Sequence, residues 1–408
     1  MTWIPPERTA DAAAIHAAAD ADRRTNPELY SLDPDDVLTR VLERTDGSTE
    51  AFLPGWRDGL EQFLGSLAED GRLNALGART MSEQATAKLV SAHRVARAIE
   101  ADATYADDLI PPIVIVGGWR TGTTFLFRLM ARDPRLRAPL PVDLTRPWRV
   151  AGLDAAAREE LLSRMDAAPS PLHVLNPDLR RVHDHGPRLP EECVLALGAD
   201  LRSWGFSSTA RLESYSRWLA QQDLGPSYRE YRRVLALLDD HDGRRFVLKS
   251  PAHLAEPGAL VDTFPGAVVV NLHRDVVETV ASGASLFSVF RSTYSDEVDP
   301  FDVGRFQTDQ TELWMRRAVE HRSAHDPATA TFVDLAYRDL VASPVEALRR
   351  VYRAAGMEPP DDLPGFVEAH HRASPRNEHG AHRYAPEDFG LDPAELRERF
   401  ADLVPSLD

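Results

Sequence analysis

The sequence predicts an α/β fold, in which a parallel sheet is flanked by helices and accompanied by a helical N-terminal region and helical insertions. Two observations support this class: short β-branched runs of the kind buried in parallel sheets, and a helix-like segment after each run. The runs lie at residues 113–116, 246–248, 267–270 and 331–333. The helices expected after them span residues 123–132, 252–264, 276–290 and 344–355.

The first 108 residues show no strand-like alternation and are rich in helix-forming alanine, leucine, arginine and glutamate. We expect residues 1–108 to be a helical region packed on an α/β domain that covers residues 109–408. The N-terminal helices are expected at residues 11–24, 35–44, 56–69 and 82–102. Within the second domain, helices at residues 155–165, 191–201 and 227–238 predict an insertion over about 150–240.

Composition excludes several classes of function. The 408 residues include 47 basic and 64 acidic side chains, which gives a formal net charge of −17 and argues against general binding to nucleic acid or anionic membranes. The single cysteine, Cys193, fits the cytoplasm and excludes a disulfide scaffold. The N-terminus lacks the apolar run of a secretory signal, and no stretch is long enough to span a membrane. We therefore expect a cytoplasmic protein in which any anionic ligand is held by a local group of basic residues.

Residues 117–124, Gly-Gly-Trp-Arg-Thr-Gly-Thr-Thr, join the first predicted strand to a helix. Glycines in such a turn let backbone N–H groups point inward, and the helix N-terminus adds a positive dipole, so the loop suits a phosphate. Gly117 and Gly122 have the spacing of an ATPase or kinase loop, but Thr123 stands where those enzymes have lysine. This disfavours a P-loop kinase. Arg120 instead suits the 5′-phosphate of a nucleotide from which another group is transferred.

A second phosphate site is predicted at the end of the strand at 268–272. Arg274 can grip a phosphate with two N–H groups, and Ser282, two helical turns later, adds a hydroxyl donor. An arginine followed by Asp275 is by itself more often a salt bridge at a helix entry. Together with the first loop, however, the pair favours phosphate binding.

Residues 114–124 resemble the 5′-phosphosulfate loop of sulfotransferases, with Trp119 in place of the usual proline. Residues 248–254, Leu-Lys-Ser-Pro-Ala-His-Leu, are similar to a bacterial branch of that family, and further landmarks follow in order through residues 109–405. The resemblance implies a P-loop-like sulfotransferase fold with 3′-phosphoadenylyl sulfate (PAPS) as donor and PAP as product. It implies donor contacts from Arg120, Thr121, Gly122, Thr123 and Thr124 to the 5′-phosphosulfate, from Arg274 and Ser282 to the 3′-phosphate, and from His382 and Arg383 closing over the nucleotide.

The catalytic groups are predicted less directly. Lys249, one of two lysines beside 45 arginines, is the candidate cation for charge that develops on the bridging oxygen. His253 and Asp143 are alternative general bases: histidine titrates near neutral pH, and other sulfotransferase branches have a glutamate near the position of Asp143. No metal is required. His183-Asp184-His185 lacks further metal ligands, and Glu191 and Glu192 are explained as the acidic first turn of a helix.

The hypothesis from these residues is a PAPS-dependent sulfotransferase that acts on a hydroxyl group of a small molecule. The alternative is a non-catalytic protein that binds PAP or another nucleotide on a sulfotransferase scaffold. The sequence names neither the acceptor nor the oligomeric state.

Overall fold

The computed structural model describes residues 2–168, 170–374 and 384–404, and it contains a five-stranded parallel sheet in the order β2-β3-β1-β4-β5. The predicted α/β class is confirmed, and the four predicted strands are present. The strand missed by the sequence, β2, has two residues, too few for a pattern to reveal it. The strands are β1 (Ile113–Gly117), β2 (Leu136–Arg137), β3 (Arg245–Lys249), β4 (Val268–His273) and β5 (Thr331–Ala336).

Strand β1 lies at the centre of the sheet and is buried along its whole length. Successive side chains of a strand point to opposite faces, so Ile113 and Ile115 pack with α5 (Thr123–Met130), α16 (Pro344–Ala354) and α17 (Leu363–Ala373). Val114 and Val116 belong to the core cluster on the other face. Helices cover both faces, which explains why the predicted strands are continuous apolar runs.

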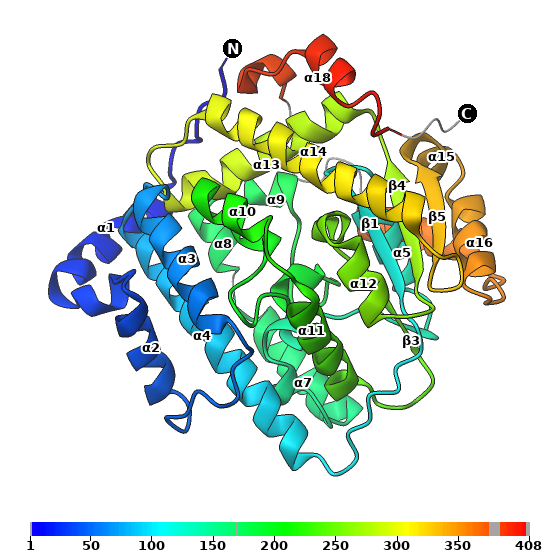
Figure 1. Ribbon diagram of the computed structural model, residues 1–408, viewed down its shortest axis with the longest axis horizontal. Coiled ribbons are helices and arrows are strands. Elements are labelled where there is room, and N and C mark those ends of the chain that lie inside the picture. The colour runs from blue at the N-terminus through cyan, green and yellow to red at the C-terminus, as the bar shows by residue number, and fades with distance from the viewer. Residues whose placement is uncertain (1, 169, 375–383, 405–408) are drawn as a thin grey trace.

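The N-terminal helices share this second core cluster with the sheet: Leu60 and Leu89 are buried in the same cluster as Val114. Figure 1 shows α1 to α4 on the left, the sheet on the right, and the insertion helices between them. The N-terminal helices are α1 (Ala10–Thr25), α2 (Pro34–Glu43), α3 (Trp56–Glu69) and α4 (Ala75–Ala101). The remaining helices are α6 (Pro141–Thr145), α7 (Ala155–Asp166), α8 (Pro171–Leu175), α9 (Leu179–Val182), α10 (Glu213–Leu219), α11 (Gly225–Leu238), α12 (Pro257–Thr263), α13 (Val276–Tyr294), α14 (Pro300–Ala324), α15 (Tyr337–Ala342) and α18 (Pro393–Arg399).

Helix α4 begins seven residues earlier than predicted. The Asn74 side chain caps it by accepting from the backbone N–H of Gly77 at 2.8 Å. Gly77 lies inside this helix, and its position requires glycine because a Cβ atom there would stand 2.1 Å from the carbonyl oxygen of Tyr294. The glycine serves a close helix crossing instead of a turn.

The predicted helix at 191–201 is wrong. The structure has a single 3₁₀ turn, Cys193–Leu195, in this segment. The ammonium group of Lys88 bonds the carbonyl oxygens of Leu195 at 2.8 Å and Leu197 at 2.5 Å, with a longer contact of 3.4 Å to Val194. An α-helix would need such carbonyls for its own N–H groups, so the half-buried lysine stabilises an irregular segment. Glu191 and Glu192 are consequently not a helical first turn.

The predicted helix at 252–264 is divided in two. A 3₁₀ segment, Pro251–Ala255, precedes α12, and Glu256 between them has an extended φ of −135°. Pro257 explains the break, because proline disfavours the helical conformation in the residue before it.

Within the described ranges, no helix is both long enough and apolar enough to cross a lipid bilayer.

Candidate functional site

The loop between β1 and α5 has an unusual backbone. Gly117, Arg120 and Gly122 all have positive φ angles, of 150°, 59° and 92°. A Cβ atom on Gly117 would lie 2.7 Å from the carbonyl oxygen of Leu272, so this position requires glycine. The Thr121 hydroxyl donates to the carbonyl oxygen of Gly118 at 2.8 Å and holds the loop closed. The chain thus bends tightly into the N-terminus of α5, where free N–H groups favour anions.

A cavity of about 370 Å³ lies beside this loop and brings together residues from six separate stretches of the chain. Six of the predicted donor-binding residues line it: Arg120, Gly122, Thr123, Thr124, Arg274 and Ser282. Thr121 does not line it, since its side chain is buried inside the loop. His382 and Arg383 lie outside the described residues. We call this space the nucleotide cavity.

Arg274 connects the two predicted phosphate segments directly. Its Nη1 atom donates to the carbonyl oxygen of Arg120 at 2.9 Å, and its Nε atom bonds Glu278. The guanidinium carbon lies 4.2 Å from the ring centre of Tyr337, a cation–π contact. The guanidinium is therefore held at the mouth of the loop by contacts that leave it partly exposed.

Lys249 is the last residue of β3 and is 2% exposed. Its Nζ atom forms an ion pair with Oε1 of Glu192 at 2.5 Å. Glu192 lines the nucleotide cavity, whereas Lys249 lies behind it. The sequence analysis missed Glu192 as a functional residue. The available signal is the pair of adjacent carboxylates in Leu189-Pro190-Glu191-Glu192, which the first turn of a helix would also explain.

The neighbouring Glu191 pairs with His183, whose Nε2 atom lies 3.1 Å from Oε2 of Glu191. Burial favours the neutral carboxyl, but His183 and Lys249 outweigh it and lower the pKa of Glu191 to about 2. Burial likewise opposes the charge of His183, yet Glu191 raises its pKa above the ordinary value.

Across the ranges that the structure describes, no three His, Cys, Asp or Glu side chains gather as a metal site would require.

A second cavity of about 430 Å³ adjoins the first, and we call it the acceptor cavity. The two cavities share five lining residues: Trp119, His183, Glu192, Pro251 and Leu286. The remaining wall is mostly apolar and includes Leu172, Val194, Leu195, Phe206, Phe287, Phe290 and Trp314. Helix α4 of the N-terminal region contributes Gln84, Ala87, Lys88 and Ser91 to it.

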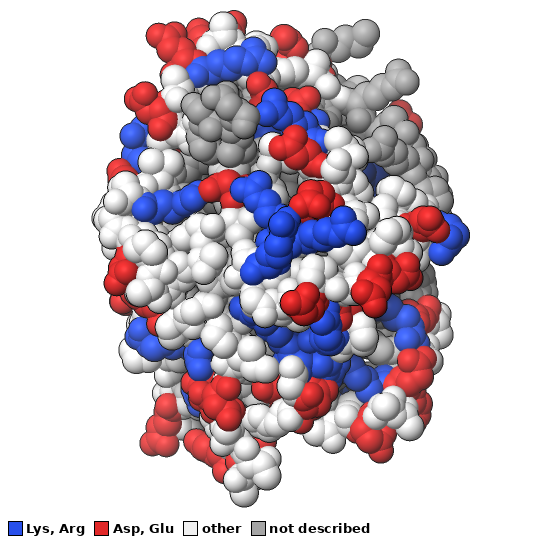
Figure 2. Space-filling model, turned by 90° about the vertical axis from the view of Figure 1, so that its right-hand side faces the viewer, with Lys and Arg blue, Asp and Glu red and all other residues white. Residues whose placement is uncertain are grey.

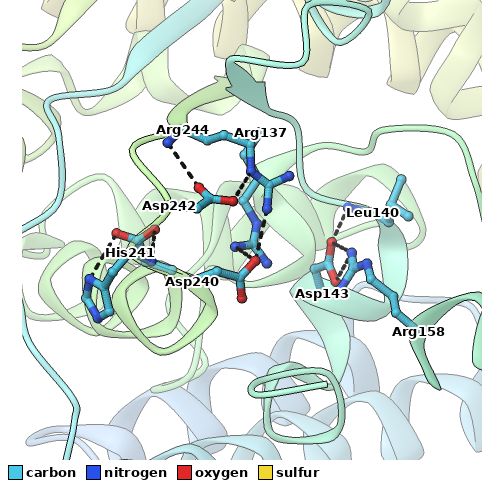
Figure 3. A network of polar contacts seen from close by, with 9 residues as sticks. Arg137, Leu140, Asp143, Arg158, Asp240, His241, Asp242 and Arg244 are labelled. Carbon is cyan, nitrogen blue, oxygen red and sulfur yellow. Dashed lines mark hydrogen bonds and ion pairs between the residues drawn. The ribbon is translucent and has the colours of Figure 1, made fainter. Parts of the chain in front are cut away.

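Neither sequence-predicted general base lies on the wall of these two cavities. His253 is 1% exposed, its Nδ1 atom is 2.8 Å from the Tyr228 hydroxyl, and burial lowers its pKa to about 3. The carboxylate of Asp143 accepts from Arg158 at 2.7 Å and from the backbone N–H of Leu140 at 2.8 Å. Figure 3 shows this pair near Arg137 and Arg244. All four residues line a third cavity. Glu192 is the carboxylate at the boundary that the nucleotide and acceptor cavities share.

Positive charge is local in this acidic protein. Figure 2 shows Lys and Arg side chains gathered across the middle of one face, with acidic side chains mostly around them. Five arginines line the nucleotide cavity: Arg120, Arg128, Arg180, Arg181 and Arg274. An anionic ligand can thus be bound despite the net charge of −17.

Comparisons with known proteins agree with this geometry. The sequence model described as "Sulfotransferase family" matches residues 111–361. Omega-hydroxy-beta-dihydromenaquinone-9 sulfotransferases of Mycobacterium bovis and Mycobacterium tuberculosis are 28% identical over 284 residues, which is 66% of this chain and 67% of theirs. The crystal structure of sulfotransferase STF1 from Mycobacterium tuberculosis superposes with a TM-score of 0.75 at 27% identity, over 90% of this chain and 98% of that one. Sulfotransferase STF9 from Mycobacterium avium, at 22% identity and the same TM-score, shares the fold.

Proposed function

The chain belongs to the sulfotransferase family, and from that premise we propose that it transfers the sulfuryl group of PAPS to a hydroxyl group of a small-molecule acceptor and releases PAP. One observation carries the proposal. The residues suited to the donor's phosphates line one cavity, an apolar cavity adjoins it, and Glu192 lies on the wall of both. The two substrates would therefore meet at a carboxylate that is paired with Lys249.

The donor would bind through its negative charges. Arg120, Thr123 and Thr124 take the 5′-phosphosulfate, together with the N–H groups around Gly122 at the start of α5. Thr121 supports the loop from within. Arg274 and Ser282 take the 3′-phosphate, so Arg274 would exchange its contact with the Arg120 carbonyl for a phosphate oxygen.

In the transfer step, the acceptor oxygen forms a bond to sulfur while the bond between sulfur and the 5′-phosphate oxygen of PAP breaks. Negative charge grows on that departing oxygen, and we assign its stabilisation to the Lys249 ammonium, which lies behind the cavity wall and is linked to it by the ion pair with Glu192. The acceptor hydroxyl must lose its proton. We assign this proton to Glu192 instead of His253 or Asp143, because Glu192 is exposed to both cavities and the other two are not.

The acceptor is inferred to be a largely apolar alcohol. The acceptor cavity is lined mainly by aliphatic and aromatic side chains, and Glu192 and His183 lie where it meets the nucleotide cavity. A relative of 28% identity is named for a hydroxylated menaquinone derivative, which is also an apolar molecule with a hydroxyl group. Such an acceptor would place its hydroxyl group at Glu192 and its apolar part between α4 and α13.

Two measurements test the proposal. Calorimetry with PAP should show saturable binding at one site, and PAPS carrying radioactive sulfur should label at least one member of a panel of apolar alcohols. Absence of PAP binding would remove the donor assignment. PAP binding without transfer to any alcohol, phenol or sugar would favour the non-catalytic nucleotide-binding protein.

A further inference from the structure

A third cavity, of about 610 Å³, lies beside the edge strand β2 and is lined by an unusual number of arginines. We call it the arginine cavity. Its six arginines come from five separate parts of the chain: Arg128, Arg132, Arg137, Arg158, Arg188 and Arg244. The acidic side chains on the same wall are Asp143 and Asp240. In a chain with a net charge of −17, such a concentration of arginine requires an explanation.

Most of these arginines are held in place by carboxylates. Arg137 and Arg244 both bond Asp240 at 2.9 Å, and Arg158 bonds Asp143 at 2.7 Å, as Figure 3 shows. Arg188 bonds Glu159 at 2.6 Å. A guanidinium has five N–H donors, so each pair fixes the orientation of an arginine and leaves it able to donate to a further oxyanion.

Arg132 is different. It has no ion pair or side-chain hydrogen bond with any residue described by the structure, and its Nε atom is buried without a partner. The Nε atom of the neighbouring Arg128 is likewise buried and unpaired, although its Nη atoms bond Asp184. A partly buried cation without a partner is unfavourable, because it has lost hydration without gaining a counter-charge.

His370 lies on the same wall, and the positive charge of the arginines affects its pKa. Burial, together with the positive charges of Arg128, Arg132 and His371, lowers the pKa of His370 to about 4. The imidazole is therefore neutral at physiological pH and adds no charge of its own. The positive potential at this point remains available for a ligand.

We propose that the arginine cavity is a second anion site, which binds a small molecule that carries a phosphate or sulfate group, with Arg132 as its principal contact. Tetrahedral oxyanions suit several guanidinium groups that approach from different sides, because each can donate two parallel hydrogen bonds. The volume exceeds what a bare ion fills, so the ligand is a molecule that bears the anionic group. The site is distinct from the nucleotide cavity, with which it shares Arg128 alone among the lining residues.

The test uses the full-length protein saturated with PAP, so that the nucleotide cavity is filled, and inorganic pyrophosphate as the probe. Calorimetry in a low-salt chloride buffer should show pyrophosphate binding to one further site. Arg132→Met should weaken that binding at least tenfold. Arg164→Met is the matched control, because Arg164 lies on α7 with 69% of its side chain exposed. The Arg164→Met protein should bind pyrophosphate with the affinity of the wild type.

Arg132→Lys separates charge from shape: it keeps the positive charge but loses the planar fork, so its affinity should fall by less than that of Arg132→Met. Absence of binding heat from pyrophosphate in the PAP-saturated protein would overturn the proposal. Arg132 variants that bind pyrophosphate as tightly as the wild type would overturn it too. If PAP itself does not bind, the Arg132 variants still identify the arginine cavity, because Arg132 does not line the nucleotide cavity. Failure of the donor assignment is therefore distinguishable from failure of this site.

Discussion

The Nζ atom of Lys249 lies 2.5 Å from Oε1 of Glu192, although 57 residues separate them in the chain. This ion pair joins the end of β3 to the irregular segment after Pro190. Lys249 is buried and Glu192 lines both cavities, so the pair brings a cation next to the carboxylate at their shared wall. The geometry makes each member of the pair testable separately.

Glu192→Gln should reduce turnover by about two to four orders of magnitude, because an amide cannot accept the acceptor's proton. PAP affinity should be unchanged or slightly higher, since the substitution removes a negative charge from the nucleotide cavity. Steady-state kinetics and PAP calorimetry measure the two effects. His253→Asn is the comparison variant, and it should keep most of the activity; loss of turnover in His253→Asn with normal activity in Glu192→Gln would return the role of base to the histidine.

Lys249→Met should abolish turnover while PAP affinity stays within a few-fold of the wild type, because the ammonium acts on charge that develops during transfer. Lys249→Arg keeps the charge and should retain a small fraction of the activity, since a guanidinium matches a single oxygen less well. Single-turnover experiments with labelled PAPS measure the transfer step itself. Wild-type rates in Lys249→Met would remove the lysine from the mechanism.

Arg274→Ala should weaken PAP binding by about ten- to a hundredfold, the effect of losing one charge-assisted hydrogen bond to a phosphate. Adenosine 5′-phosphosulfate, which lacks the 3′-phosphate, should bind wild type and Arg274→Ala with similar affinity. Arg349→Ala on α16, which removes an arginine 52% exposed, is the control. Equal loss of affinity for both nucleotides would contradict the assignment of Arg274 to the 3′-phosphate.

The sequence predicts the sheet and the tight turn between β1 and α5 well because their signals are local. A β-branched run such as residues 113–116 is buried on both faces and needs no partner to be recognised, and Arg120 to Thr124 are consecutive. Glu192 could not be predicted in the same way. Its proposed role rests on the ion pair with Lys249. The segment after it is held by Lys88, which lies more than 100 residues away from the carbonyls that it bonds. The helix propensity of residues 191–201 is overridden by these tertiary contacts.

Lys88 is the basis of a prediction about positioning. Its ammonium group holds the segment that follows Glu192, so Lys88→Met should lower kcat more than it raises KM and should leave PAP affinity unchanged. Burial lowers the pKa of Lys88 to about 7, and deprotonation removes one of its three donors. As the pH rises above 7, the wild type should lose kcat because Lys88 deprotonates, whereas Lys88→Arg should not, because a guanidinium stays protonated. The ratio of the wild-type kcat to the Lys88→Arg kcat should therefore decrease. A constant ratio across this range would show that the charge of Lys88 has no part in positioning Glu192.

The His183–Glu191 pair predicts how stability depends on pH. Glu191 has a pKa lowered from 4.5 to about 2, so its contribution to the free energy of unfolding is present above pH 4.5 and is lost as the pH falls towards 2. His183 has a raised pKa, so its contribution is complete below pH 6.5 and is lost as the pH rises through the folded-state value. The pair is therefore most stabilising between about pH 4.5 and 6.5.

Glu191→Gln should lower the free energy of unfolding by about 1 to 3 kcal/mol within this interval, and the difference from wild type should shrink on both sides of it. Urea unfolding at a series of pH values measures this difference. Glu61→Gln on α3, 49% exposed in an i,i+4 pair with Arg57, is the matched control and should change stability by less than about 0.5 kcal/mol at every pH. A Glu191→Gln difference that is constant with pH would mean that packing, and not the ion pair with His183, determines the role of Glu191.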